Sequence, residues 1–217
     1  MPLKIVPQRD RKLYRLVKRG ESLTLQRNEI LFRPGDPARE LYLVRQGHIR
    51  LSQAGEEGKG RTVAVVGPWE MGGEKGLLPG TPRDFVAAAG EESVVILLDG
   101  REVRRTLQTS EKTFQAFLRA KEAEVALARA LTGHRRPGGA GARLGLLLTH
   151  LADRLGRPGE KGVRIPVRLT HQLLADLSSS HRSTVTTLLN DWMYRDMLEE
   201  EAGHLEILDA GKLRDGL

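Results

Sequence analysis

Residues 169–192 read LTHQLLADLSSSHRSTVTTLLNDW, and this stretch decides the fold of the chain. Thr170 is suited to cap a helix over residues 172–177, because a threonine hydroxyl can accept from amides of the first helical turn. Three serines then predict a tight turn, with Ser180 placed to cap a second helix. Small Ala175 lies where the two helices must approach. In the second helix the apolar residues recur at i, i+3, i+4 and i+7, which gives one buried face: Val185, Leu188, Leu189 and Trp192.

Two short helices joined by a tight turn form a helix-turn-helix, whose second helix enters the DNA major groove by its N-terminal end. Its polar face is then expected to read double-stranded DNA. That face carries Arg182, Ser183, Thr186, Thr187 and Asn190. Arginine can bond guanine or phosphate, threonine methyls can touch the thymine methyl, and asparagine can pair with adenine. Phosphate contacts are expected from the residues at the helix starts: Ser180, His181 and Thr170. The alternative is a solvated helical hairpin.

The segments that flank this motif predict a winged helix. Residues 197–198 and 203–208 form two short apolar runs around a turn, which predicts a β-hairpin wing. Upstream, residues 143–155 carry leucines at helical spacing, and residues 163–169 alternate like a short strand.

Residues 133–141 hold four glycines and one proline, so regular structure is not expected there and we predict a hinge. The segment Gly139-Ala140-Gly141 is not a dinucleotide fingerprint. No strand precedes it, and Leu144 stands where the third glycine is required.

The N-terminal half predicts a β-barrel or sandwich. Short apolar or alternating runs are separated by glycine turns every 8 to 12 residues between residues 21 and 99. A basic helix over residues 9–19 precedes them, with Leu13, Leu16 and Val17 on one face. The expected strands are residues 22–25, 29–32, 41–44, 48–52, 62–66, 85–89 and 93–98.

Residues 110–132 predict one long helix, since they contain no glycine or proline and are rich in helix formers. At 1.5 Å per residue it would be roughly 35 Å long. Lys121 and Glu124 interrupt a strict heptad, so the apolar stripe predicts either a homodimer seam or packing on the chain's own barrel. The stripe comprises Phe114, Phe117, Leu118, Val125, Ala128 and Leu131.

The amino-acid composition excludes several classes of functional site. The 217 residues hold 35 Lys plus Arg against 28 Asp plus Glu, a net charge of +7, and no cysteine. Disulfides, thiolate nucleophiles and iron–sulfur clusters are thereby excluded. No run of 18 apolar residues occurs, so we expect a cytoplasmic protein with no membrane partner.

The charge is unevenly distributed. Residues 134–195 carry +6, whereas residues 196–217 carry −5, so the acidic wing end is expected to face away from phosphates or to be screened. The first 19 residues carry another +6, to which we assign no role.

An enzyme is not expected. The six histidines lack metal-ligand spacing, and neither a nucleophile elbow nor a phosphate-binding loop occurs, so we predict no catalytic residue and no metal site. The remaining alternative to a transcription factor is a ligand-binding barrel whose helical tail docks to protein.

The order of barrel, long helix, hinge and winged helix resembles the cyclic AMP receptor and fumarate-nitrate regulator superfamily of bacterial transcription factors. Three stretches carry the resemblance: EILFRPGDPARELYLVRQG at residues 29–47, GGEKGLL at residues 72–78 before Arg83, and residues 169–192. Residues 182–189 look particularly like the cyanobacterial global nitrogen regulators, as do His134-Arg135 and Arg143-Leu144.

This resemblance implies an α+β chain with an N-terminal β-roll of the cyclic-nucleotide-binding type, a long central dimerisation helix and a C-terminal winged helix-turn-helix. The implied boundaries are residues 1–109, 110–133, a hinge at 134–142, and 143–217. It also implies a homodimeric regulator on a two-fold symmetric promoter site, with RNA polymerase as a partner.

For an effector the resemblance implies less. Cyclic-nucleotide members offer a Gly-Glu pair to the ribose, an Arg-Ser pair to the phosphate and hydroxyls on the long helix to the adenine. Gly73-Glu74 and Arg83 match, but Asp84 replaces the serine and would repel a phosphate. Ala128-Arg129 stands about where the hydroxyls are expected. We therefore expect no effector, with cyclic AMP and 2-oxoglutarate as alternatives. The plain alternatives are a surface ion pair for Arg83-Asp84 and a turn for Gly73-Glu74.

The recognition helix also departs from the family. Familiar members have Arg-Glu-Thr-Val-x-Arg there, whereas Ser183 and Thr187 replace the Glu and the second Arg. The turn glycine is replaced by Ser179, and its apolar neighbours by Ser178 and Ser180. Each lost base contact removes roughly 1–3 kcal/mol of discrimination, so the site read is expected to differ from the common half-site.

Overall fold

The computed structural model describes residues 11–53, 60–132 and 139–215. The chain divides into two compact units, and the division falls between Lys121 and Glu122. Each unit has its own apolar core.

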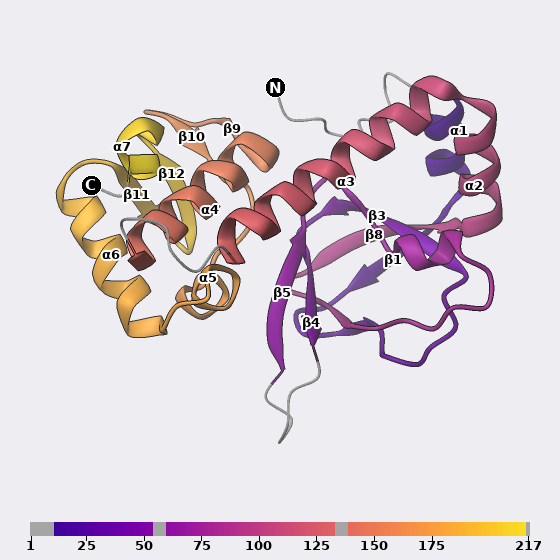
Figure 1. The fold of residues 1–217 in the computed structure, drawn as a ribbon, viewed down its shortest axis with the longest axis horizontal. Helices are drawn as coiled ribbons and strands as arrows, with labels where there is room; N and C mark the ends of the chain where they lie inside the picture. Colours follow the sequence, from indigo (N-terminus) through magenta and orange to yellow (C-terminus); the bar gives the residue numbers. More distant parts are fainter. Residues whose placement is uncertain (1–10, 54–59, 133–138, 216–217) are drawn as a thin grey trace. The chain divides into compact units, whose positions relative to one another are not determined.

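The first unit contains two four-stranded antiparallel sheets, as in a double-sheet β-roll (Figure 1). The strand order in one sheet is β1-β8-β3-β6, with β1 Glu21–Leu25, β8 Ser93–Asp99, β3 Glu40–Gln46 and β6 Met71–Gly72. The order in the other is β2-β7-β4-β5, with β2 Ile30–Phe32, β7 Val86–Ala89, β4 Ile49–Gln53 and β5 Arg61–Val66. The seven predicted strands are all present, with ends shifted by a few residues.

Strand β3 is buried on both faces. Tyr42 and Val44 pack between the sheets, in the cluster that contains Ile49 of β4. Leu41 and Leu43 point the opposite way, because successive side chains alternate along a strand, and they pack in a second cluster. That cluster contains Leu13 and Val17 of α1 Arg11–Arg19 and Val103 of α2 Gly100–Thr109. The two-sided burial explains why the predicted strand 41–44 is wholly apolar.

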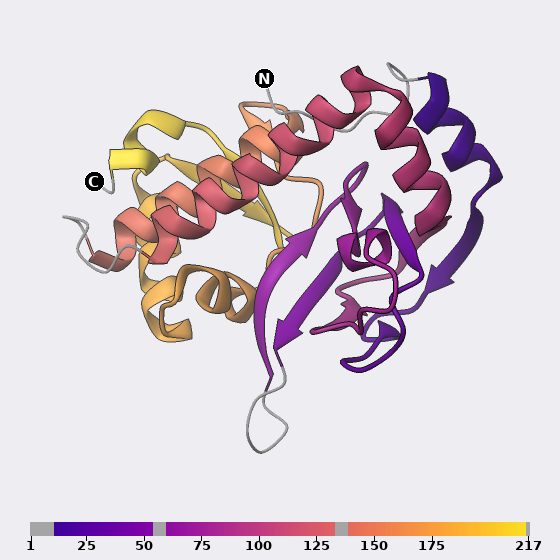
Figure 2. The ribbon, with the colours of Figure 1, turned by 45° about the vertical axis from the view of Figure 1, so that its right-hand side comes forward.

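Helix α2, which was not predicted from the sequence, lies beside α1 in the first unit (Figure 2). Asp99 caps it, since its Oδ1 accepts from the amides of Arg101 and Glu102 at 2.8 and 3.1 Å. Strand β6 and the short 3-10 helix η3 Glu74–Leu77 were also not predicted. Residues 9 and 10 of the predicted N-terminal helix lie outside the described residues.

Helix α3 Glu111–Thr132 is the predicted long helix. The residues of its apolar stripe differ in their exposure to solvent. Phe117 is partly buried, whereas Phe114, Leu118 and Val125 are 45, 49 and 47% exposed. Ala128 is exposed, and the side chain of Leu131 lies outside the described part.

Beyond the end of α3, the described part of the second unit combines four helices with a small sheet of order β11-β12-β10-β9. The helices are α4 Gly139–Leu155, α5 His171–Ser178, α6 Arg182–Tyr194 and α7 Ala210–Asp215. The strands are β11 Leu198–Glu201, β12 His204–Ile207, β10 Val163–Arg164 and β9 Arg157–Pro158. The β11–β12 hairpin is the predicted wing. The predicted strand 163–169 is wrong beyond Arg164, and Pro166 within it has no amide to donate to a ladder.

The predicted hinge is partly wrong. Residues 133–138 lie outside the described residues, but Gly139, Ala140 and Gly141 are helical and open α4. Gly141 is buried, so small residues here serve close packing rather than a linker. The same holds at Gly145, where a Cβ would lie 1.8 Å from the carbonyl oxygen of Leu213.

Candidate nucleic-acid interface

The α5–turn–α6 motif is shaped by its own side chains. Thr170 is the N-cap of α5, as predicted, and its Oγ1 accepts from the amide of Leu173 at 3.2 Å. Ser179 ends α5 in the left-handed conformation, with φ of 52°. The amide of Ser180 returns to the carbonyl of Ala175 at 2.9 Å, which closes the turn. The chain therefore turns sharply into α6 within three residues.

The prediction that Ser180 caps α6 is wrong. His181 is the N-cap residue of α6, and its side chain makes no capping hydrogen bond. The Ser180 hydroxyl instead donates to the carbonyl of Ser178 at 3.3 Å, so it stabilises the turn that precedes the helix.

Arg143, which was not among the predicted site residues, holds the turn from α4. Its Nε donates to the carbonyl of Ser178 at 3.0 Å, and its Nη2 lies 3.4 Å from the carbonyl of Ser179 and from Oγ of Ser180. A rigid planar guanidinium suits such a set of oxygens. These partners are 35 to 37 positions away in the sequence, so no local pattern indicates the contact.

Helix α6 separates an apolar face from a polar one. Val185, Leu189 and Trp192 are at most 1% exposed. The opposite side holds the predicted DNA-reading residues: Arg182, Ser183, Thr187 and Asn190 are exposed, and Thr186 is partly buried. The structure thus brings all five predicted residues to one side of one helix.

Two threonines of this face already use their hydroxyl hydrogens. Thr186 Oγ1 donates to the carbonyl of Arg182 at 3.0 Å, and Thr187 Oγ1 donates to that of Ser183 at 3.1 Å. A hydroxyl has one hydrogen, so these side chains can offer DNA only acceptor lone pairs and methyl groups.

His171 joins three elements of the motif and was not predicted as a site residue. Its Nδ1 lies 2.8 Å from Thr186 Oγ1, and its Nε2 lies 3.5 Å from Oε2 of Glu200 in β11. Since the Thr186 hydrogen goes to Arg182, Nδ1 of His171 must be the donor in the first contact. His171 thereby connects α5 with α6 and with strand β11.

The acidic residues of the wing have partners, so the screening alternative describes this end of the chain. Glu199 pairs with Lys161 at 2.5 Å and Glu201 with Arg164 at 3.0 Å. Glu206 Oε1 accepts from the amides of Lys161 and Gly162, both at 2.6 Å. These backbone hydrogen bonds, that of Lys161 foremost, lower the pKa of Glu206 below its usual value. The acids therefore hold the wing sheet together.

The predicted effector positions lie in the first unit, around η3. Gly73 precedes this helix with φ of 82°, a conformation that favours glycine. Arg83 is buried, and its Nη1 and Nη2 donate to the carbonyls of Gly73 and Glu40 at 3.1 and 2.6 Å. Its guanidinium also lies 4.3 Å from the ring centre of Phe32. Burial lowers the pKa of Arg83.

The structure does not bring the Asp84 carboxylate to Arg83. Asp84 pairs with Lys75 at 2.5 Å, and Glu74 pairs with Lys121 of α3. The alternative of a surface Arg83–Asp84 ion pair is therefore wrong, as is a plain turn at Gly73-Glu74, where η3 begins. Lys121, which interrupts the apolar stripe of α3, contacts the barrel through its ion pair with Glu74.

Within the described parts of the chain, no three His, Cys, Asp or Glu side chains are grouped so that they could hold a metal ion. Nor does any helix there have the length and apolar character to cross a membrane.

Comparison with protein families gives two matches that together span most of the chain. Residues 22–110 match the cyclic nucleotide-binding domain, and residues 142–215 match the Crp-like helix-turn-helix domain.

Curated relatives are regulators. The global nitrogen regulator of Nostoc sp. is 30% identical over 177 residues, which are 81% of this chain and 79% of that protein. The cyclic AMP receptor protein of Thermus thermophilus is 28% identical over 190 residues, 85% of this chain and 82% of the relative.

Solved structures share the fold. A CRP-family transcriptional regulator from Thermus thermophilus superimposes with a TM-score of 0.65 at 24% identity, covering 89% of this chain and 95% of that one. FixK2 from Bradyrhizobium japonicum gives a TM-score of 0.74 at 16% identity, with 90% and 96% covered.

The Arg143 contacts predict a local loss of stability. Arg143→Met should lower the free energy of unfolding by about 1–2 kcal/mol, because the carbonyls of the turn lose a charged donor. Amide hydrogen exchange at Ser179 and Ser180 should become faster. The matched control is Arg157→Met, at an exposed arginine of the same unit. Equal unfolding curves and equal exchange for both variants would show that the Arg143 contacts do not hold the turn.

Proposed function

The chain belongs to the family of CRP-like transcriptional regulators, and from this premise we propose that it acts as a homodimer on a two-fold symmetric promoter site without requiring a small-molecule effector. It is a transcriptional regulator with a DNA-binding helix-turn-helix domain and not an enzyme.

The exposed polar side of α6 carries the proposal for DNA. Arg182 lies in the first turn of the helix and is exposed, so its guanidinium is free to approach a guanine edge or a phosphate. Ser183, Thr187 and Asn190 follow it on the same side, and Thr186 adds a methyl group. At the helix starts, Thr170, Ser180 and His181 are proposed to contact phosphates, although Thr170 and Ser180 also serve the motif internally.

The exposed apolar residues of α3 support the homodimer. Phe114, Leu118 and Val125 point to one side of the helix, since their positions fall within about 40° of one another at 100° per residue. Large apolar groups left at 45–49% exposure gain free energy when a second copy covers them. We propose these three residues as the centre of the seam, with Phe117, Ala128 and Leu131 at its margin.

Contacts within the first unit support effector independence. In the cyclic-nucleotide members a ligand would meet the residues at the positions of Glu74 and Arg83. Here the Glu74 carboxylate is paired with Lys121 of α3, and both terminal nitrogens of Arg83 donate to backbone carbonyls. The Glu74–Lys121 ion pair thus joins the barrel to the long helix without a ligand. Cyclic AMP is the alternative, because several relatives are named for it; 2-oxoglutarate is a further one.

The remaining parts of the proposal follow from the family. We propose residues 1–109 as the effector-type domain, residues 110–133 as the dimerisation helix and, instead of 143–217, residues 139–217 as the DNA-binding domain. The hinge is shortened to the residues before Gly139, where α4 begins. A promoter-bound regulator of this kind implies RNA polymerase as a partner and the cytoplasm as its location.

The role of Arg182 is testable by substitution. The DNA site is first recovered from random DNA by selection for binding to the wild-type protein. Arg182→Ala should weaken binding to this site by about 5- to 150-fold, which corresponds to roughly 1–3 kcal/mol for one base contact. Gel-shift competition against random DNA measures this loss. Arg195→Ala is the matched control, because Arg195 follows the same helix at its other end and pairs with Asp191. An unchanged footprint for Arg182→Ala would refute the assignment.

The seam is testable by sedimentation. Leu118→Glu should convert the dimer to monomers, because each copy would bury an unpaired carboxylate in an apolar seam. Arg119→Glu is the control, since its neighbouring exposed position points about 100° away on the helix. A wild-type monomer, or a Leu118→Glu variant that remains dimeric, would contradict the proposed seam.

A further inference from the structure

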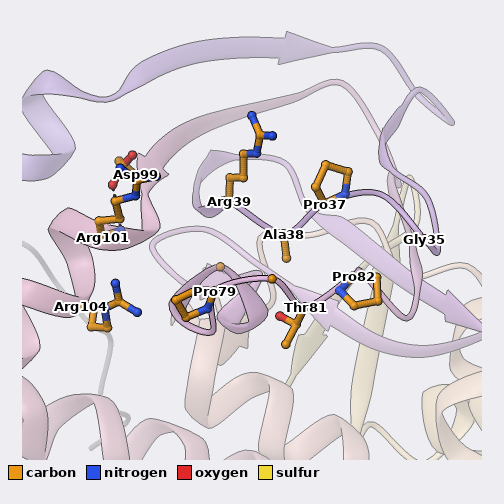
Figure 3. A pocket seen from close by; sticks show the side chains of 12 residues that line it. Gly35, Pro37, Ala38, Arg39, Pro79, Thr81, Pro82, Asp99, Arg101 and Arg104 are labelled. Atoms are coloured by element: carbon orange, nitrogen blue, oxygen red, sulfur yellow. Dashed lines mark hydrogen bonds between the residues drawn. The ribbon is translucent and has the colours of Figure 1, made fainter.

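A hollow in the first unit lies beside the segment that carries the effector positions, and neither Glu74 nor Arg83 lines it. It has a volume of about 820 Å³, within the range of roughly 300–1,000 Å³ that small-molecule pockets have. Figure 3 shows three segments around it: residues 35–39, residues 79–82 and the start of α2. The residues that line it are Gly35, Pro37, Ala38, Arg39, Gly76, Pro79, Gly80, Thr81, Pro82, Asp99, Arg101 and Arg104.

Backbone hydrogen bonds join the segment of residues 35–39 to the segment that leads from residue 79 to Arg83. The amide of Gly35 donates to the carbonyl of Arg83 at 3.0 Å, and that of Ala38 donates to Thr81 at 3.1 Å. Pro37 and Pro82 form a bridge between the same segments, and their rings fix the backbone φ angles. The pocket is therefore formed before any ligand arrives.

The start of α2 also packs closely against its neighbours in the pocket. The amide of Gly100 donates to the carbonyl of Arg39 at 2.9 Å. A Cβ at Gly100 would lie 1.9 Å from the carbonyl oxygen of Gly76, and one at Gly76 would lie 2.5 Å from that of Glu40. Only glycine permits these approaches, so the start of α2 is held against both loops.

The lining is strongly cationic. Arg39 comes from the loop before β3, and Arg101 and Arg104 come from α2. Arg104 Nη1 donates to the carbonyl of Leu77 at 3.3 Å, which orients its guanidinium. Asp99 also lines the pocket, but its Oδ1 is occupied by two amides of α2. Three arginines thus place like charges beside one hollow, and an anion bound there relieves their mutual repulsion.

We propose that this pocket binds a small phosphorylated anion that carries at least two negative charges. Guanidinium groups bind phosphate oxygens through paired, charge-assisted hydrogen bonds, and the hollow has room for more than one phosphate group. Gly76 lies in η3 and Thr81 lies in the loop that connects η3 with Arg83, so a ligand here contacts the segment that carries the effector positions. This site is independent of the proposed effector-free DNA binding.

The full-length protein is titrated with inorganic pyrophosphate by calorimetry, and with citrate as a non-phosphate polyanion. We expect saturable binding of pyrophosphate at one site per chain, and citrate at least about tenfold weaker. Arg101→Gln and Arg104→Gln should each weaken pyrophosphate binding by about tenfold or more, since each loses one charged contact. Arg105→Gln should bind as the wild type does, because Arg105 is exposed on the same helix and does not line the pocket.

The thermal midpoint of each variant shows whether it is folded. If Arg104→Gln is unfolded because it has lost the hydrogen bond to the carbonyl of Leu77, pyrophosphate binding is measured on Arg39→Gln in its place. The proposal is overturned if the wild-type protein shows no saturable binding of pyrophosphate, or if each of the three pocket substitutions leaves that binding unchanged. It is also overturned if Arg105→Gln weakens pyrophosphate binding as much as the pocket substitutions do. Citrate binding as tight as pyrophosphate binding would overturn the assignment to phosphate.

Discussion

The burial of one face of α6 is the constraint on which the DNA-binding surface depends. Val185, Leu189 and Trp192 are almost completely removed from solvent, and each such side chain contributes roughly 1.5–3 kcal/mol to folding. This burial fixes the rotation of the helix about its axis, so Arg182, Thr187 and Asn190 must face outward. Arg143, His171 and the paired acids of the wing then fix where the helix begins and what lies beside it.

Repeating patterns made much of the fold predictable from the sequence. The helical spacing of Val185 to Trp192 and the apolar runs of the barrel reflect local geometry, and the structure has those elements. Contacts between distant residues could not be predicted in this way. Arg143 and the serine turn are 35 or more positions apart, as are Lys121 and Glu74, and neither pair follows a periodic pattern.

Residue composition alone does not determine the structure where tertiary packing decides it. The glycines at 139 and 141 suggested a linker, yet they open a helix whose Gly141 is buried in the second unit. Ser180 fitted a helix cap by residue type, yet its hydroxyl is used inside the turn. The sequence alone shows that Glu74 and Asp84 accompany Arg83, but not which groups each of them contacts. In the structure Arg83 donates to backbone carbonyls, whereas Glu74 and Asp84 each pair with a lysine.

We propose that the protein reads DNA as a dimer while Lys121 is paired with Glu74 and backbone carbonyls accept from Arg83. The most direct measurement is the affinity and stoichiometry of the purified full-length protein on DNA recovered by unbiased selection, with and without cyclic AMP or 2-oxoglutarate. We expect two protomers on one two-fold symmetric site and the same affinity in all three conditions. Specific binding that occurs only when one of these effectors is added would contradict the claim.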